Sequence, residues 1–253
     1  TLGKMFKHAG YQTAFVGKWH LDKPDDVETW AVGHDFDLAV QEQWSGRFGG
    51  RIFSPNRLWV NGDQEFVPYD YKKYDCKDHF RTNIAFDWLD QRDVKKPFFL
   101  FMSYRAPHSF EGPLRDTLDY KEKDWPEIEK AHAAKITLLD KQIGRLINKL
   151  KEIDELDNTL ILFTSDNGPH FADGGHELEF FNSNGKLRGG KRDLYEGGVR
   201  VPLIAYWKNK IRPKGKSYHI SGFQDIMATF AEIIDYKVGE NIDGISFLPT
   251  LLN

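Results

Sequence analysis

The spacing of hydrophobic positions predicts an alternation of helices and strands along this chain. Apolar residues at helical spacing predict helices at residues 2–9, 79–92 and 127–153, and another that begins after Ser221 as its N-cap. Short apolar runs rich in β-branched or aromatic residues predict strands at residues 12–16, 57–60, 98–102, 159–164 and 201–206. Because the two kinds of element alternate, we predict an α/β sandwich with a central, largely parallel mixed β-sheet flanked by helices.

The helix predicted at residues 127–153 carries the longest apolar stripe. Its members recur every three or four positions, and they are Ile136, Leu139, Ile143, Leu146, Ile147 and Leu150. Residues at that spacing share one face of a helix. We therefore expect the stripe to lie in the core.

The composition is that of an ordinary globular protein, and it excludes some classes of function. Hydrophobic residues make up 40% of the 253 residues and charged residues 29%. The net charge is −3 and no basic stripe is concentrated anywhere, so we expect no nucleic-acid partner. No apolar run is long enough for a membrane span, and the N-terminus carries no signal-peptide pattern. The one cysteine, Cys76, lies among residues that do not activate a thiol and is interpreted as structural.

Polar side chains directly follow two of the predicted strands, as expected of a ligand site. Asp166 and Asn167 come after the strand at 159–164, and Lys18 and His20 after the strand at 12–16. In open α/β sheets, ligands bind beyond the carboxyl ends of the strands. Carboxylate and amide oxygens suit a divalent cation such as Ca²⁺ or Mg²⁺. Alternate residues of an extended segment point the same way, so Lys18 and His20 are expected to face one ligand together.

Two further polar loops carry candidate residues. His108 follows the strand at 98–102, and its ordinary pKa range suits a proton donor to a leaving group. Lys191 lies among Gly189, Gly190 and the later pair Gly197-Gly198, and such glycines let the backbone approach an anion closely. Each motif alone is better explained as a turn, a solvated lysine or a structural histidine. Their coincidence favours a site.

The motifs lie in an order that resembles one family. Residues 10–13 followed by Gly17-Lys18-Trp19-His20-Leu21 resemble the second signature of the formylglycine-dependent sulfatases, which belong to the alkaline-phosphatase superfamily. Later blocks are similar to that family at residues 97–100, 106–108, 165–168, 190–191, 195–202 and 243–249. The similarity runs in family order along essentially all 253 residues. The resemblance implies that residues 1–253 are part of a sulfatase catalytic domain.

This resemblance implies a metal and an anion site. Asp166 and Asn167 would ligate the divalent cation, which in this family is usually Ca²⁺, with Mg²⁺ as the alternative. Lys18 and Lys191 would hold the sulfate oxygens, where positive charge offsets the charge that develops in the transition state.

The resemblance also assigns the two histidines, and it exposes a departure. His20 would assist release of sulfate, and His108 would protonate or bind the leaving oxygen of the ester. The family nucleophile is a Cys or Ser in a Cys/Ser-x-Pro-x-Arg motif, converted to formylglycine, and the 253 residues contain no such motif. The paired acidic residues and the small C-terminal subdomain of the family are not found either. We therefore expect a truncated member whose nucleophile lies outside this chain.

Three functions remain open at this point. The first is a sulfuric ester hydrolase that acts on a small-molecule or carbohydrate sulfate ester. A carbohydrate is suggested by Trp30, Trp44, Trp59 and the histidine-rich loop 170–176, because aromatic faces stack on sugars. The second is a phosphoesterase or phosphonate hydrolase of the same superfamily, and the third is a non-catalytic relic that binds anions. By resemblance, we expect a periplasmic or secreted protein; no oligomeric state is predicted.

Overall fold

The chain forms two compact units. The computed structural model describes residues 1–23, 26–42, 57–61, 63–66, 72–108, 114, 116–170, 176–213, 215–239 and 241–253, with only the backbone at 42, 57–59 and 63–66. The first unit contains residues 1–70, 80–105 and 212–253. The second unit contains residues 71–79 and 106–211.

The predicted helices and strands are present, with ends that differ by at most two residues. The α-helices are α1 (Leu2–His8), α2 (Lys77–Gln91), α3 (Glu127–Glu152), α4 (Glu196–Val199), α5 (Phe223–Ile233) and α6 (Leu248–Leu252). The strands are β1 (Gln12–Lys18), β2 (Leu38–Glu42), β3 (Arg57–Val60), β4 (Asp63–Phe66), β5 (Phe98–Ser103), β6 (Ile161–Thr164) and β7 (Leu203–Tyr206). Short 3₁₀ helices lie at Val27–Thr29, Val32–His34, Leu118–Tyr120 and Leu156–Asn158. Across the part of the chain that the structure describes, no helix is both long and apolar enough to cross a membrane.

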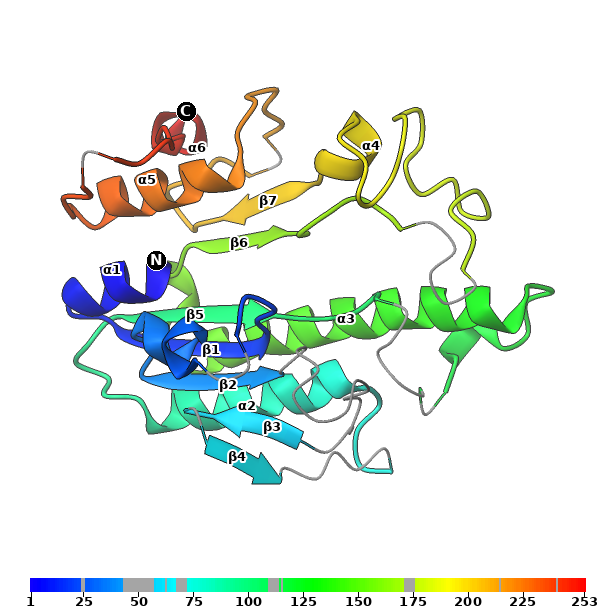
Figure 1. Cartoon of the computed structure of the whole chain (residues 1–253), viewed down its shortest axis with the longest axis horizontal. Coiled ribbons are helices and arrows are strands. Elements are labelled where there is room, and N and C mark those ends of the chain that lie inside the picture. The colour runs from blue at the N-terminus through cyan, green and yellow to red at the C-terminus, as the bar shows by residue number, and fades with distance from the viewer. Residues whose placement is uncertain are drawn as a thin grey trace. The chain divides into compact units, whose positions relative to one another are not determined.

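The first unit is built on a mixed sheet in which β2, β1 and β5 run parallel. The strand order is β4-β3-β2-β1-β5 (Figure 1). β1 runs parallel to β2 and β5, whereas β3 and β4 pair antiparallel. Five successive residues of β1, Thr13–Gly17, are buried. A strand buried on both faces reads as a continuous apolar run, which is why residues 12–16 could be assigned from sequence.

Helices cover both faces of this sheet. On one face, Phe15 of β1 packs with Phe36 and Ala39, and the ring of Phe6 from α1 stacks on Phe99 of β5 with centroids 4.1 Å apart. On the other face, Val16 and Val40 pack against the side chains of α2, and Figure 1 shows α1 and α2 on opposite sides of the sheet. Consecutive residues of a strand point to opposite faces, so Phe15 and Val16 anchor different layers. The predicted sandwich is confirmed in this unit.

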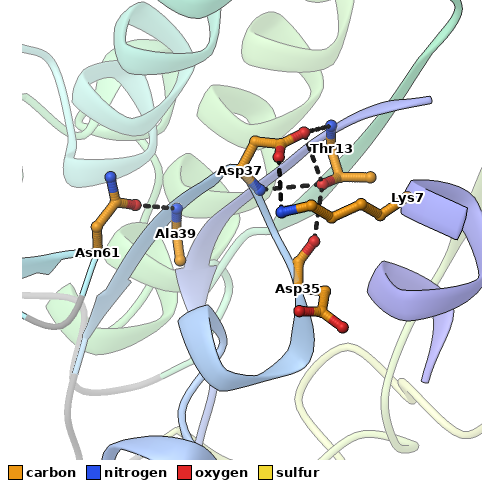
Figure 2. A network of polar contacts seen from close by, with 6 residues as sticks. All are labelled: Lys7, Thr13, Asp35, Asp37, Ala39 and Asn61. Carbon is orange, nitrogen blue, oxygen red and sulfur yellow. Dashed lines mark hydrogen bonds and ion pairs between the residues drawn. The ribbon is translucent and has the colours of Figure 1, made fainter. Parts of the chain in front are cut away.

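A polar network ties α1 to the start of the sheet (Figure 2). The carboxylate of Asp37 accepts hydrogen bonds from the backbone N–H of Thr13 at 2.9 Å and its hydroxyl at 3.2 Å, and it pairs with Lys7 at 3.0 Å. Burial opposes ionisation of Asp37, but the bonds from Lys7 and Thr13 outweigh it and lower its pKa. Beside this group, the amide oxygen of Asn61 accepts from the backbone N–H of Ala39 at 2.8 Å.

The second unit contains α3 and an antiparallel pair of strands, β6 and β7. All four residues of β6 are only half-buried, and Ile204 of β7 is 59% exposed. Of the six residues predicted to form the core stripe of α3, Leu150 is buried and four are half-buried, but Ile136 is 46% exposed. The prediction for Ile136 is wrong: it shares a helix face with the other five, but the spacing does not show which turns of that face are covered. Leu138, which lies outside the stripe, is only 1% exposed.

The start of α5 also differs from the prediction. Its N-cap is Gly222 rather than Ser221. The carboxylate of Asp225 accepts from the backbone N–H of Gly222 at 2.7 Å and from that of Ile245 at 2.8 Å. Both bonds favour the ionised form and lower the pKa of Asp225. A carboxylate that reaches back from the third position of the helix thus replaces the predicted serine hydroxyl.

Candidate active site

Lys18 and His20 lie where β1 leaves the sheet of the first unit. Gly17 has a φ of 127°, and a Cβ there would lie 2.0 Å from the backbone oxygen of Ser103. The hydroxyl of Ser103 donates to the backbone oxygen of Lys18 at 2.6 Å, so β5 fixes the end of β1. His20 is exposed and has a φ of 57°. The strand ends at Lys18, so the alternation argument does not reach His20; a shared ligand remains a prediction.

Asp166 and Asn167 follow β6 in the second unit, in a tightly bonded turn. The hydroxyl of Ser165 donates to the backbone oxygen of Asn167 at 2.9 Å. The amide nitrogen of Asn167 donates to the backbone oxygen of Gly168 at 2.8 Å, which directs the amide oxygen the other way. The carboxylate of Asp166 belongs to an exposed residue. The turn thus presents a carboxylate and an amide oxygen, which are ligands that Ca²⁺ and Mg²⁺ prefer.

Close contacts between glycines hold this turn against the segment around α4. The backbone N–H of Gly168 donates to the oxygen of Gly198 at 2.9 Å. A Cβ at Gly168 would lie 1.9 Å from the oxygen of Gly197, and one at Gly197 would lie 2.1 Å from the oxygen of Gly189. No side chain fits at those separations. These glycines therefore let neighbouring backbone segments come close together. The sequence had suggested a different role for them, in which the backbone approaches an anion.

The loop of Lys191 is bonded to the same turn. The backbone N–H of Lys191 donates to the oxygen of Pro169 at 2.7 Å, and that of Gly197 donates to the oxygen of Arg188 at 2.8 Å. The carboxylate of Asp193 accepts from the N–H of Gly190 at 3.0 Å and closes the loop. The structure therefore brings the Lys191 loop directly onto the residues that follow Asn167.

His108 belongs to the second unit and is half-buried. The ammonium group of Lys135, a buried residue of α3, lies 3.5 Å from the backbone oxygen of His108. Two residues earlier, the N–H of Ala106 donates to the carboxylate of Asp78 at 3.0 Å. These contacts position the backbone of the His108 loop from α3 and from the start of α2.

Sequence reasoning missed a buried group next to these loops. Glu129, at the start of α3, is 1% exposed and contacts the ring of His176 at 2.5 Å. The ring of His132 stacks on that of His176, with centroids 3.7 Å apart. Burial, followed by the nearby charges of His176, His170 and Lys135, lowers the pKa of His132 to about 4. The available signal was the pairing of Glu129 and His132, one turn apart, with the histidine-rich loop.

The predicted site residues fall into two sets. His108, Asp166, Asn167 and Lys191 belong to the second unit, where the Lys191 loop is bonded to the Asp166–Asn167 turn. Lys18 and His20 belong to the first unit, and their convergence with the other set remains a prediction.

Two oxygen ligands are only part of a cation shell. Ca²⁺ takes about six to eight oxygen ligands, so Asp166 and Asn167 would contribute part of that set. Within the described ranges, no group of three or more His, Cys, Asp or Glu residues could hold a metal ion. The hard oxygen chemistry of the turn fits a divalent cation whose remaining ligands come from elsewhere.

Of the tryptophans suggested as sugar platforms, Trp30 does not support that role. Trp30 is fully buried in the first unit, so it offers no face to a sugar. Trp44 and the side chain of Trp59 lie outside the described residues. Cys76 is buried, as expected of a structural residue.

Comparison with known proteins gives a consistent result. A family model described as Sulfatase matches residues 1–236. An uncharacterized sulfatase of Escherichia coli, YdeN, is 29% identical and aligns over 99% of this chain and 46% of its own length. The N-acetylgalactosamine-6-sulfatase of Homo sapiens is 27% identical, over 99% of this chain and 48% of its own length. The chain thus spans about half the length of the curated relatives it matches.

Solved structures share the fold. The crystal structure of Ps i-CgsB in complex with k-i-k-neocarrahexaose has a TM-score of 0.80 and 25% sequence identity, over 98% of this chain and 56% of that one. The structure of BT4656 in complex with D-glucosamine-2-N,6-O-disulfate has a TM-score of 0.71 and 23% identity, over 100% of this chain and 64% of that one. At that identity, the second likeness supports the fold alone.

Proposed function

Because the chain belongs to the sulfatase family, we propose that its 253 residues form part of a catalytic domain that hydrolyses sulfate monoesters. The observation that carries the proposal is the bond from the backbone N–H of Lys191 to the oxygen of Pro169, at 2.7 Å. Through it, a cationic loop is fixed to a turn that carries two oxygen ligands. A metal and a sulfate group bound side by side need that pairing.

The proposed metal ligands are Asp166 and Asn167. A divalent cation, Ca²⁺ or alternatively Mg²⁺, would there offset the negative charge of the sulfate oxygens. Asp166 is exposed and so accessible to such an ion. The amide of Asn167 is held by its bond to the backbone oxygen of Gly168 before any ligand binds, which limits the entropy lost on binding.

The proposed anion and proton-transfer groups are cationic or titratable near neutral pH. Lys18 and Lys191 would hold the sulfate oxygens, and His108 would give its proton to the ester oxygen as the sulfur–oxygen bond breaks. His20 would assist the release of sulfate. The formylglycine nucleophile is assigned to a segment outside these 253 residues, since the motif for it is not among them.

A sulfated carbohydrate is the proposed substrate class. Two kinds of relative support it, namely the N-acetylgalactosamine-6-sulfatases at 26–27% identity and the Ps i-CgsB structure with a bound neocarrahexaose at 25%. A periplasmic or secreted location is proposed with it, by family resemblance.

Calorimetric titration of the protein with Ca²⁺, and then with an aryl sulfate in saturating Ca²⁺, tests this function. We expect Asp166→Ala to abolish Ca²⁺ binding, because one of two oxygen ligands is removed together with its negative charge. Lys191→Ala should weaken sulfate-ester binding at least tenfold and leave Ca²⁺ binding nearly intact.

Matched controls are available in the same unit. Asp154→Asn and Lys186→Ala change exposed residues of like charge, and both should bind as the wild type does. Unchanged Ca²⁺ affinity in Asp166→Ala would remove that residue from the site. Tighter binding of an aryl phosphate than of the aryl sulfate would favour the phosphoesterase alternative.

A further inference from the structure

A buried carboxylate of α3 bonds to the far end of the loop that follows the proposed metal turn. One oxygen of Glu129 lies 2.5 Å from the Nδ1 atom of His176, and the other accepts from the backbone N–H of Glu177 at 2.9 Å. The side chains of Glu129 and His176 are only 2% and 3% exposed. A buried carboxylate is costly unless it is fully hydrogen-bonded, and here both oxygens are engaged.

Two more histidines complete this cluster. His132 lies three residues after Glu129, on the same side of α3, and its ring lies nearly parallel to that of His176, at an interplanar angle of 10°. The ring of His170 lies edge-on to His176, with centroids 5.4 Å apart, and edge-on to His132 at 6.3 Å. Both ends of segment 170–176 are thus packed on the first turns of α3.

This cluster is continuous with the proposed site. His170 follows Pro169, whose backbone oxygen accepts from the N–H of Lys191 at 2.7 Å. Gly168, one residue earlier, donates to the oxygen of Gly198 at 2.9 Å. The turn that carries Asp166 and Asn167 is therefore held from one side by the α4 segment and from its C-terminal side by the cluster on α3.

We propose that Glu129 is a positioning residue, which fixes the turn of Asp166 and Asn167 through His176 and His170. This inference rests on the proposed function for its consequence, which is the affinity of the turn for a divalent cation. Its structural content is independent of that function, because it concerns how firmly the turn and the Lys191 loop are held.

The geometry argues against a metal site within the cluster itself. Stacked imidazoles place their nitrogens side by side in parallel planes and do not converge on one point. The carboxylate of Glu129 is already bonded to His176 and Glu177. Among the described residues, no group of three or more possible ligands could hold a metal. The low pKa of His132 keeps its ring uncharged at neutral pH, which suits close packing against His176.

Hydrogen exchange of backbone amides tests the proposal directly. Glu129→Gln keeps the size of the side chain and one acceptor oxygen, but its NH₂ group cannot accept from His176. We expect exchange in peptides that contain Gly168 and Lys191 to accelerate at least tenfold, and exchange in peptides from β1 to be unchanged. Ca²⁺ affinity, measured by calorimetry, should fall at least tenfold.

The matched control is Glu127→Gln on the same first turn of α3. Glu127 is 81% exposed and pairs with Lys130, so this change removes the same charge from the helix start without touching the cluster. If Glu129→Gln and Glu127→Gln show exchange within twofold of each other at Gly168 and Lys191, the positioning role is contradicted. Acceleration spread equally over β1 would also contradict it, because that result indicates general destabilisation.

One outcome separates this inference from the proposed function. Faster local exchange in Glu129→Gln together with no Ca²⁺ binding by the wild type would retain the positioning role and reject the metal assignment. If Glu129→Gln does not fold, His176→Asn replaces it, since its shorter amide cannot reach Glu129 in the same way. Unchanged exchange at Gly168 in His176→Asn would then overturn the proposal.

Discussion

The two units place their polar loops by different physical means. In the first unit, Lys18 ends a strand with five successive buried residues, which lies between β2 and β5 in a five-stranded sheet. In the second unit, Asp166 and Asn167 follow a strand of four half-buried residues in a two-stranded pair. An isolated two-stranded sheet is only marginally stable in water. The second loop therefore depends on interlocked glycine backbone and on the cluster around Glu129 rather than on a buried strand.

Because of this difference, we expect mutations in the first unit to change mainly stability and mutations at the loops of the second unit to change mainly ligand binding. Where buried strands position a loop, a lost side chain lowers the free energy of unfolding of the whole unit. Where backbone contacts position a loop, one added methyl group displaces the metal-binding side chains that the loop carries. It has a smaller effect on the free energy of unfolding of the rest of the unit. Substitutions in the two units should therefore have different signatures.

The largest effect is expected in the buried strand. Phe15 is 1% exposed and its ring contacts those of Trp19, Phe36 and Phe101. Phe15→Ala should lower the free energy of unfolding by about 3–5 kcal/mol. Phe163→Ala in half-buried β6 should lower it by roughly 1–2 kcal/mol, in proportion to the smaller area removed from water. Urea denaturation measures both, and equal losses would contradict the contrast between the units.

An intermediate effect is expected at the interlocked glycines. A Cβ at Gly168 would lie 1.9 Å from the oxygen of Gly197, so Gly168→Ala should cost about 1–3 kcal/mol and weaken Ca²⁺ binding at least tenfold. A Cβ at Gly144 of α3 would meet nothing within 4 Å, and Gly144→Ala should stabilise the helix by about 0.5–1 kcal/mol. Calorimetry and denaturation compare the two. Normal Ca²⁺ binding in Gly168→Ala would show that the turn tolerates displacement.

The smallest effect is a difference in acid sensitivity. The pKa of His132 is lowered from 6.5 to about 4, so between those pH values the unfolded chain takes up a proton that the folded chain does not. The stability of the second unit should therefore fall as the pH falls from 6.5 to 4. In the first unit, the pKa of Asp37 is lowered from its ordinary 3.8. The stability that its ionised carboxylate contributes is therefore lost only as the pH falls below 3.8.

The variant His132→Phe isolates this effect, since it keeps an aromatic ring against His176 and Phe181. Unfolding free energies between pH 7 and pH 4 should show a flatter profile in the variant than in the wild type. Parallel profiles would assign the acid sensitivity to other groups.

Elements were predictable from the sequence where burial imposes a local period. The run of apolar residues in β1 is visible without a structure, because a strand covered on both faces has few polar positions. The aromatic run in β5 is equally visible, although β5 is only half-buried and Phe101 is 42% exposed. The predicted burial of Ile136 failed because helical spacing places the six apolar residues on one face but does not show which turns of that face are covered. The cap of α5 failed because the reach of Asp225 to Ile245 joins residues 20 positions apart.

The residues of the candidate site could be named from the sequence and their chemistry stays a prediction, whereas the contacts that hold their loops could not be predicted. Asp166, Asn167 and Lys191 could be named because polar residues after strands are unusual in a pattern of buried runs. The bond from Lys191 to Pro169 and the contact of Glu129 with His176 join segments 22 and 47 positions apart, which no local period encodes.

The central claim is that the turn of Asp166 and Asn167 binds a metal ion beside a sulfate group held by Lys191. A crystal structure of the protein grown with Ca²⁺ and sulfate, with the calcium located by anomalous scattering, tests it most directly. We predict a calcium ion at about 2.3–2.6 Å from oxygens of Asp166 and Asn167, with a sulfate oxygen contacted by Lys191. A calcium ion bound elsewhere, or Lys191 turned away from the sulfate, would contradict the account.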